Sequence, residues 1–235
     1  MTANLIIAIA GDSITGCAGR WPFPALTVTS TGDCTSPAAQ TAASYASGRL
    51  LMRNMAISGS HLAGDPANNP VSFIRPTYID PLYAIKMFAR SGPTPRKYLY
   101  INAIGSNDGA IAAYPSVALY AAAVAADIVA AKAAGADFGW ICGLLPRADA
   151  GAALTEANRL AYNALVTDPS WRAANGVDDC IDLSSAAHAG PLNLPANNGG
   201  DTTWYMADNI HPQNVLSAEI GVIALAKFNA LLATI

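Results

Sequence analysis

The sequence predicts an α/β fold in which helices cover both faces of a central parallel sheet. Short apolar runs alternate with longer helical patterns, as in repeated βα units. The apolar runs show little alternation of polar and apolar residues, as expected for strands that are buried on both faces. We expect five strands, near Leu5–Ala10, Arg53–Ala56, Tyr98–Ala103, Phe138–Gly143 and Val177–Leu183.

Helical patterns fill the intervals between these runs and the end of the chain. The expected helices are Pro37–Met52, Tyr78–Ala89, Pro115–Ala134, Thr155–Thr167 and a last one near Pro212–Ala233. The most apolar long stretch, Ser116 to Ala136, is interrupted by Asp127 and Lys132. It is interpreted as an alanine-rich helix that packs on the sheet and keeps one edge in water.

The length of 235 residues fits one domain with a substantial core, and we expect a single domain over residues 1–235. An apolar fraction of 52% and a charged fraction of 12% exclude a disordered chain. Two segments are expected to be long surface loops, Gly19 to Pro37 and Ser184 to Ala207. Loops of this length in a compact domain are often functional.

Charge and hydropathy exclude several classes of partner. The net charge of −3 provides no basic stripe for nucleic acid, and no run of about 18 uncharged apolar residues predicts a membrane span. The apolar start, Met1 to Ala10, has no Lys or Arg before it, which argues against a signal peptide. The expected location is therefore cytoplasmic by default, or that of a larger secreted or particle-bound protein. The oligomeric state is left open.

The four cysteines show no CxxC motif and no metal-ligand spacing. Cys142 and Cys180 lie in apolar runs and are expected to be buried free thiols. Cys17 and Cys34 bracket a loop, and whether they form a disulfide is left open.

Polar clusters follow the first three predicted strands and precede the last helix. They are Gly11-Asp12-Ser13, Ser58-Gly59-Ser60, Gly105-Ser106-Asn107-Asp108 and Asp208-Asn209-Ile210-His211. Open parallel sheets bind ligands at the carboxyl ends of their strands, so these clusters predict a site at one edge of the sheet.

The chemistry of the clusters is complementary. A serine hydroxyl needs a base to take its proton, and His211 suits that role near neutral pH, with His61 as a weaker alternative. Asp208, three residues before His211, can hold the other ring nitrogen. The backbone N–H groups of Ser13 and Gly59 and the Asn107 amide are candidate donors to an oxyanion.

This set resembles the GDSL-like, or SGNH, hydrolase family over nearly the whole chain. Gly11-Asp12-Ser13, followed by Ile-Thr rather than Leu, is similar to the nucleophile block, and Asn54 to Gly59 to the block with the oxyanion glycine. Gly105 to Asp108 and Asp208 to Pro212 are similar to the Gly-x-Asn-Asp and Asp-x-x-His blocks. The resemblance implies a flavodoxin-like three-layer α/β/α sandwich with about five parallel strands, and ester, thioester or amide hydrolysis without a metal or organic cofactor.

The expected activity is ester hydrolysis through an acyl-enzyme, with Ser13, Asp208 and His211 as the catalytic triad. We favour small acyl groups such as acetyl on a carbohydrate, because Trp21, Trp204 and Tyr205 lie in polar loops near the predicted cleft and can stack on a sugar. These aromatics can equally cover the edge of the core. A lysophospholipase or thioesterase is the alternative within the family.

Alternatives from other classes are a non-catalytic carbohydrate-binding or structural module of the same fold and a nucleotide-binding flavodoxin-like protein. The chain has no Gly-x-Ser-x-Gly elbow, no Gly-x-Gly-x-x-Gly fingerprint and no phosphate loop. The absence of a phosphate-cradling loop argues against the nucleotide-binding alternative.

Overall fold

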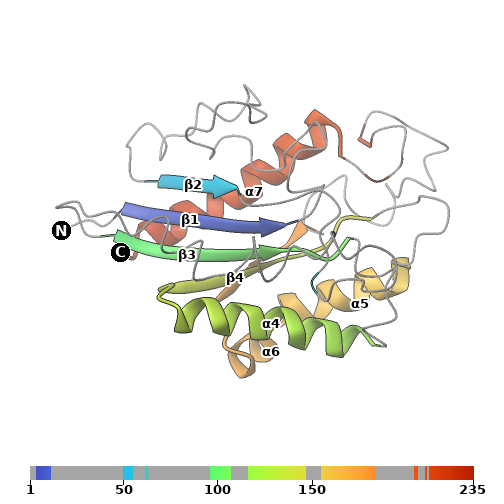
Figure 1. Cartoon of the computed structure of the whole chain (residues 1–235). Helices are drawn as coiled ribbons and strands as arrows, with labels where there is room; N and C mark the ends of the chain where they lie inside the picture. The colour runs from blue at the N-terminus through green and yellow to red at the C-terminus, as the bar shows by residue number, and fades with distance from the viewer. Residues whose placement is uncertain are drawn as a thin grey trace, which may run out of the picture.

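A parallel five-stranded sheet forms the centre of the molecule. A computed structural model of the chain describes residues 4–11, 50–54, 62, 96–106, 116–146, 155–183, 204–205, 210 and 212–235. The strands lie in the order β2-β1-β3-β4-β5, and every neighbouring pair is parallel (Figure 1). They span Asn4–Gly11 (β1), Leu50–Asn54 (β2), Arg96–Ala103 (β3), Phe138–Cys142 (β4) and Asp179–Ile181 (β5). The expectation of a parallel sheet with about five strands is confirmed.

Both faces of the sheet are buried, as β1 illustrates. Its residues alternate between two apolar clusters: Leu5, Ile7 and Ile9 belong to one, and Ile6, Ala8 and Ala10 to the other. Because successive side chains of a strand point to opposite faces, each face of β1 must be covered by a separate layer. This explains why the strand is continuously apolar rather than alternating.

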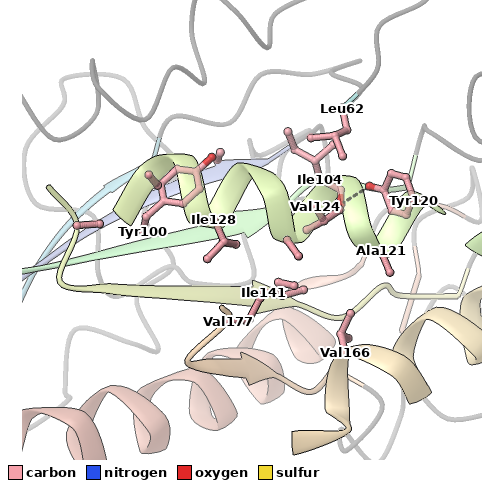
Figure 2. Packing of buried hydrophobic residues seen from close by; sticks show 14 of the residues in the cluster. Leu62, Tyr100, Ile104, Tyr120, Ala121, Val124, Ile128, Ile141, Val166 and Val177 are labelled. Atoms are coloured by element: carbon pink, nitrogen blue, oxygen red, sulfur yellow. Dashed lines mark hydrogen bonds between the residues drawn. The ribbon is translucent and has the colours of Figure 1, made fainter. Parts of the chain in front are cut away.

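Helices supply the two covering layers (Figure 1). On one face lies α7 (Asn214–Leu232), which contributes Leu216, Ile220, Ala224, Phe228 and Leu232 to the first cluster. On the other face lie α4 (Val117–Ala133) and α5 (Glu156–Thr167), whose apolar residues pack with Tyr100 and Ile141 of the sheet (Figure 2). The arrangement is the expected three-layer sandwich.

Side-chain caps mark the starts of α4 and α5, whereas α7 begins without one. Ser116 Oγ accepts a hydrogen bond from Leu119 N at 3.2 Å, and Thr155 Oγ1 accepts one from Asn158 N at 3.2 Å. Each cap satisfies a backbone donor that has no partner within its helix. The expected helices Pro115–Ala134, Thr155–Thr167 and Pro212–Ala233 are found within two residues at each end, while Tyr78–Ala89 lies outside the described residues.

Two predicted boundaries near residue 50 are wrong. Residues 50–52, expected as the end of a helix Pro37–Met52, belong to β2, which also begins three residues before the expected strand Arg53–Ala56. Leu51 and Met52 are good helix formers, but parallel pairing beside Ile6 and Ile7 of β1 overrides that preference. The rest of the expected helix lies outside the described residues.

A short helix, α6 (Pro169–Ala174), was not predicted. Asp168 caps it by accepting a hydrogen bond from Ser170 N at 2.8 Å, and Pro169 occupies its first position. An Asp-Pro pair of this kind is a recognised helix start, so the signal was present in the sequence.

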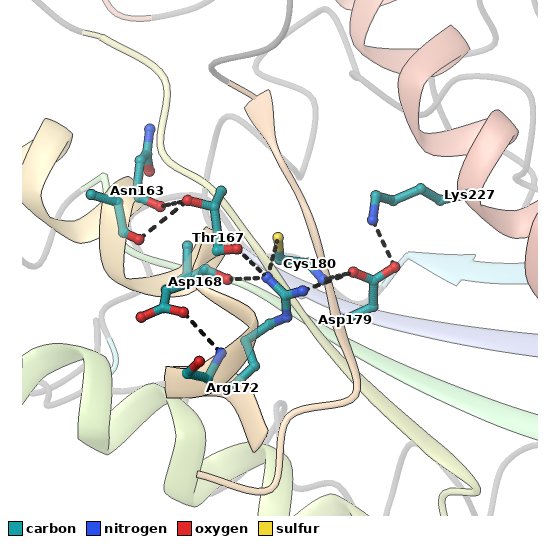
Figure 3. A network of polar contacts seen from close by, with 10 residues as sticks. Asn163, Thr167, Asp168, Arg172, Asp179, Cys180 and Lys227 are labelled. Carbon is teal, nitrogen blue, oxygen red and sulfur yellow. Dashed lines mark hydrogen bonds and ion pairs between the residues drawn. The ribbon is translucent and has the colours of Figure 1, made fainter. Parts of the chain in front are cut away.

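A polar network ties α6 to β5 and α7 (Figure 3). Arg172 Nη1 donates to the backbone oxygens of Val166 and Thr167 at 3.0 and 2.7 Å, and its Nη2 lies 3.7 Å from Asp179 Oδ1. Lys227 Nζ of α7 donates to Asp179 Oδ2 at 2.6 Å. The network anchors the edge strand β5 from both sides. In the described part of the chain, no helix is long and apolar enough to span a membrane.

Candidate active site

Six of the predicted site residues lie outside the described residues. They are Ser13, Trp21, Gly59, Asn107, Asp208 and His211. The described residues show where the strands that precede three of the motif blocks end. Gly11 of β1 is paired with Ala103 of β3, and Asn54 of β2 with Ile9 of β1. Three of the four motif blocks therefore leave the sheet at the same edge.

The turn after β3, which leads into Asn107, is held by side chains. Ile104 N donates to Asn102 Oδ1 at 3.0 Å, and Tyr120 Oη of α4 donates to the Ile104 oxygen at 2.8 Å. Asn102 is fully buried, and Ser106 at the end of the turn is also buried. Both backbone polar groups of residue Ile104 are thus paired with side chains instead of a neighbouring strand.

The burial of Asp127 contradicts the expectation that it lies on the solvent-exposed edge of its helix. It was assigned to a wet edge of the alanine-rich helix, but it is only 1% exposed and faces the sheet. Its Oδ2 accepts hydrogen bonds from Tyr100 Oη at 2.7 Å and from Asn102 Nδ2 at 2.9 Å. Lys132, the other charged residue of that helix, is partly exposed and pairs with Asp178 at 2.8 Å. A buried carboxylate is tolerated here because β3 supplies two donors.

Gly105 is required where it stands. Its φ is 154°, and a Cβ built on it would lie 2.5 Å from Leu144 Cδ2 and 2.8 Å from Tyr120 Oη. No side chain fits at those distances without displacing a neighbour. The glycine of the Gly-x-Asn-Asp block therefore allows the turn to pass close to Tyr120 and to the chain after β4.

The segment after β4 is held by α5. Asn163 pairs with both polar groups of Leu144: its Oδ1 accepts from Leu144 N at 2.8 Å, and its Nδ2 donates to the Leu144 oxygen at 3.0 Å. Arg159, which is 1% exposed, donates to the same oxygen at 3.2 Å and pairs with Glu156. Leu144 in turn contacts the position of Gly105, so α5 supports the β3 turn indirectly.

The segment with Asp208 and His211 is enclosed by paired residues. Gln213 N donates to the Trp204 oxygen at 2.7 Å, and Tyr205 forms an isolated antiparallel bridge with Pro212. The chain on the two sides of residues 206–211 is therefore held together at one point, directly before α7.

Trp204 and Tyr205, expected as substrate contacts or core covers, both pack against the cluster under α7. Trp204 is partly buried, and Tyr205 has no exposed surface. Burial raises the pKa of the Tyr205 phenol, with Arg159 opposing the shift. For Tyr205 this placement favours the core-cover alternative. The sequence could not distinguish substrate contact from core packing, because both roles place an aromatic side chain beside the predicted cleft.

The two described cysteines, Cys142 and Cys180, are both buried, as expected. Burial raises the pKa of Cys180, although Arg172 and Lys227 oppose the shift. A buried thiol that resists ionisation is a poor nucleophile. Within the described ranges, no group of three or more His, Cys, Asp or Glu side chains is arranged to hold a metal ion.

Sequence comparison identifies no related protein. No protein-family model matches the chain, and no curated protein is significantly similar to it.

Solved structures match it over almost its full length. A carbohydrate acetylesterase from Sinorhizobium meliloti aligns with a TM-score of 0.63 at 14% identity, covering 97% of this chain and 99% of that one. The aryl esterase of M. smegmatis aligns at 0.60 and 15% identity, covering 97% and 100%. A GDSL-like lipase from Bacteroides thetaiotaomicron aligns at 0.53 and 16% identity, covering 97% and 88%. The chain therefore has the fold of the GDSL-like, or SGNH, hydrolases.

Proposed function

We propose that this chain is a serine ester hydrolase with Ser13 as nucleophile, His211 as general base and Asp208 as the residue that orients the histidine. The observation that carries the proposal is that three strands end at the same edge of the sheet. β1, β2 and β3 end beside one another, and each leads into one block of the hydrolase pattern. The fourth block, Asp208 to Pro212, follows Tyr205 in the sequence, and Tyr205 is bridged to Pro212.

Chain length supports the convergence of these blocks. Ser13 follows Gly11 by two residues and Asn107 follows Ala103 by four. Since an extended residue spans at most about 3.6 Å, Ser13 lies within about 7 Å of Gly11 and Asn107 within about 14 Å of Ala103. Gly11 and Ala103 are paired neighbours, and paired strands are about 4.8 Å apart. A hydroxyl and an amide donor are thus available for one small substrate.

The chemistry follows from these roles. His211 removes the proton of Ser13 as the hydroxyl oxygen attacks the acyl carbonyl, and the tetrahedral oxyanion is held by the N–H groups of Ser13 and Gly59 and by Asn107. His211 then gives the proton to the leaving alcohol. In the second half it takes a proton from water, which attacks the acyl-enzyme and releases the acid. No metal or organic cofactor takes part.

The proposed substrate class is a short acyl ester, acetyl above all, on a carbohydrate or another small alcohol. The similar fold of a carbohydrate acetylesterase supports this choice. The aromatic residues Trp21 and Trp204 are the candidates for contact with the alcohol part. Chain-length profiling with p-nitrophenyl esters tests the acyl preference: rates should fall steeply beyond butyrate, and a preference for long acyl chains would favour a lipase or lysophospholipase instead.

The decisive experiment compares wild type with Ser13→Ala and His211→Ala in p-nitrophenyl acetate hydrolysis. We expect each substitution to lower kcat by about four orders of magnitude or more, because the members of a catalytic triad act as one unit. Circular dichroism of each variant checks that it folds.

A fluorophosphonate probe provides an independent readout. Wild type should be labelled at Ser13, and Ser13→Ala should not be labelled. A wild type that neither hydrolyses esters nor reacts with the probe would favour the non-catalytic binding module. Full activity of Ser13→Ala would exclude this serine as the nucleophile.

A further inference from the structure

We propose that Tyr120 of α4 is a positioning residue for the oxyanion-binding turn after β3. Its hydroxyl lies 2.8 Å from the Ile104 oxygen, three residues before Asn107. This inference rests on the proposed function, because it assigns Tyr120 the task of fixing the turn from which Asn107 donates its hydrogen bond.

The geometry of the turn requires such a contact. β3 ends at Ala103, and the next residues no longer form part of a strand. Asn102 holds the Ile104 N–H from inside β3, at 3.0 Å, while Tyr120 holds the carbonyl of the same residue from a different element. The two successive peptide groups on either side of Ile104 are thus each held by a side chain, and we take these contacts to set the direction in which the chain continues toward Asn107. Figure 2 shows the Tyr120–Ile104 contact beside Leu62 at the edge of the buried cluster.

Tyr120 is itself held firmly. It is 8% exposed, and its ring packs against Tyr162 of α5 with a centroid distance of 5.4 Å. Seven residues later on α4, Asp127 binds Asn102 through Nδ2 at 2.9 Å. Residues seven apart lie on the same face of a helix. One face of α4 therefore carries both Tyr120, which binds the Ile104 oxygen, and Asp127, which binds the side chain of Asn102. The Gly105 position leaves room for the Tyr120 hydroxyl, because a Cβ there would lie 2.8 Å from it.

The expected kinetic effect is specific to the transition state. An oxyanion donor acts on charge that develops during the reaction, so a displaced donor lowers kcat and leaves substrate binding nearly unchanged. Complete removal of one donor costs about 10²–10³ in kcat. A shift of the turn by part of an ångström should cost less, about tenfold.

The test uses two matched variants. Tyr120→Phe and Tyr100→Phe each remove one buried hydroxyl from the same apolar cluster. The Tyr120 hydroxyl binds the turn directly. The Tyr100 hydroxyl binds Asp127 at 2.7 Å, and its removal leaves in place the Asn102–Asp127 and Ile104–Asn102 hydrogen bonds that support the turn. We expect Tyr120→Phe to lower kcat for p-nitrophenyl acetate about tenfold with KM changed less than about twofold. Tyr100→Phe should lose a similar amount of thermal stability and keep kcat within about twofold of wild type.

A double-mutant cycle with Asn107→Ala provides a readout that a structural role would not change. If Tyr120 acts through Asn107, the Tyr120→Phe substitution should have no further effect on kcat once Asn107 is alanine. Equal kcat losses in Tyr120→Phe and Tyr100→Phe would overturn the inference. A loss that persists at full size in the Asn107→Ala background would overturn it as well.

The two proposals fail in different ways. If Ser13→Ala abolishes activity but Tyr120→Phe keeps wild-type kcat, the hydrolase assignment stands and the positioning role is wrong. If Asn107→Ala keeps wild-type kcat while Ser13→Ala abolishes activity, Asn107 is not a donor and Tyr120 has nothing to position. Wild-type protein without hydrolysis or probe labelling overturns the proposed function and the positioning role together.

Discussion

The burial of Tyr205 distinguishes between its two expected roles, packing in the core and contact with substrate. Its ring belongs to the cluster under α7 and has no exposed surface. Within the described part of the chain, its hydroxyl has no hydrogen-bond partner. A buried hydroxyl without a partner costs free energy that a phenylalanine at the same place does not incur.

We therefore predict that Tyr205→Phe unfolds with a free energy equal to that of wild type or up to about 1 kcal/mol higher at pH 8. KM for p-nitrophenyl acetate should not change. Urea titration measures the first quantity and steady-state kinetics the second. A rise in KM of tenfold or more would restore Tyr205 as a substrate contact.

The same residue predicts a pH dependence. Burial raises the pKa of Tyr205 in the folded protein above the value of about 10 for an unfolded chain. Above pH 10 the unfolded chain therefore loses this proton first, and stability falls as pH rises toward the folded pKa. Between pH 8 and pH 10.5 wild type should lose more unfolding free energy than Tyr205→Phe does. An equal loss in both proteins would show that the phenol titrates normally.

At the scale of elements, the sequence predicted the sheet well because the strands are short, mostly apolar runs, and the first three are followed by polar clusters. It failed near residue 50, where Leu51 and Met52 suit either a helix or a strand and only pairing with β1 decides. It also failed for α6, whose Asp168-Pro169 start is local and was overlooked. Hydrophobic periodicity locates elements, but it does not decide between two structures that bury the same residues.

The supporting residues of the candidate site were harder to predict than its motif residues. Asn102, Tyr120, Asp127 and Asn163 each lie inside an element and bind a residue at least two positions away, or on another element. In the sequence, Asp127 marks the exposed edge of a helix as readily as a buried contact. Its partners come from β3, about 25 residues earlier in the chain, and no local pattern reveals such a pairing.

Asn163 provides the prediction at this scale. Because its side chain pairs with both polar groups of Leu144, Asn163→Ala removes the side-chain partner of the buried Leu144 N–H and leaves the Leu144 oxygen with Arg159 as its remaining side-chain donor. We expect a loss of about 2–3 kcal/mol in the free energy of unfolding. Asn158→Ala, on the exposed side of the same helix, is the matched control and should change stability by less than about 0.5 kcal/mol. Similar small changes in both variants would show that the Leu144 segment does not depend on α5.

At the scale of the whole molecule, α7 connects the end of the chain to the first strand. Phe228 is fully buried, and its ring stacks on Trp140 of β4 with a centroid distance of 5.5 Å and an interplanar angle of 9°. Leu5, Ile7 and Ile9 of β1 belong to the same cluster. Since this cluster joins residues from both ends of the sequence, the sheet and α7 should unfold in one cooperative step.

Phe228→Ala tests that cooperativity. We predict a loss of about 3–5 kcal/mol in the free energy of unfolding, the usual cost of removing a buried phenylalanine ring. Tryptophan fluorescence and far-ultraviolet circular dichroism should still report one coincident transition in urea. Val222→Ala changes a residue of α7 that is 69% exposed and should change stability by less than about 0.5 kcal/mol. If Phe228→Ala instead unfolds in two steps, with a loss of helical signal before the main transition, α7 is a separate cooperative unit. In that case the sheet keeps its order without α7, and the segment before α7, which contains Asp208 and His211, adjoins a less stable element than the strands β1 and β3, which precede Ser13 and Asn107.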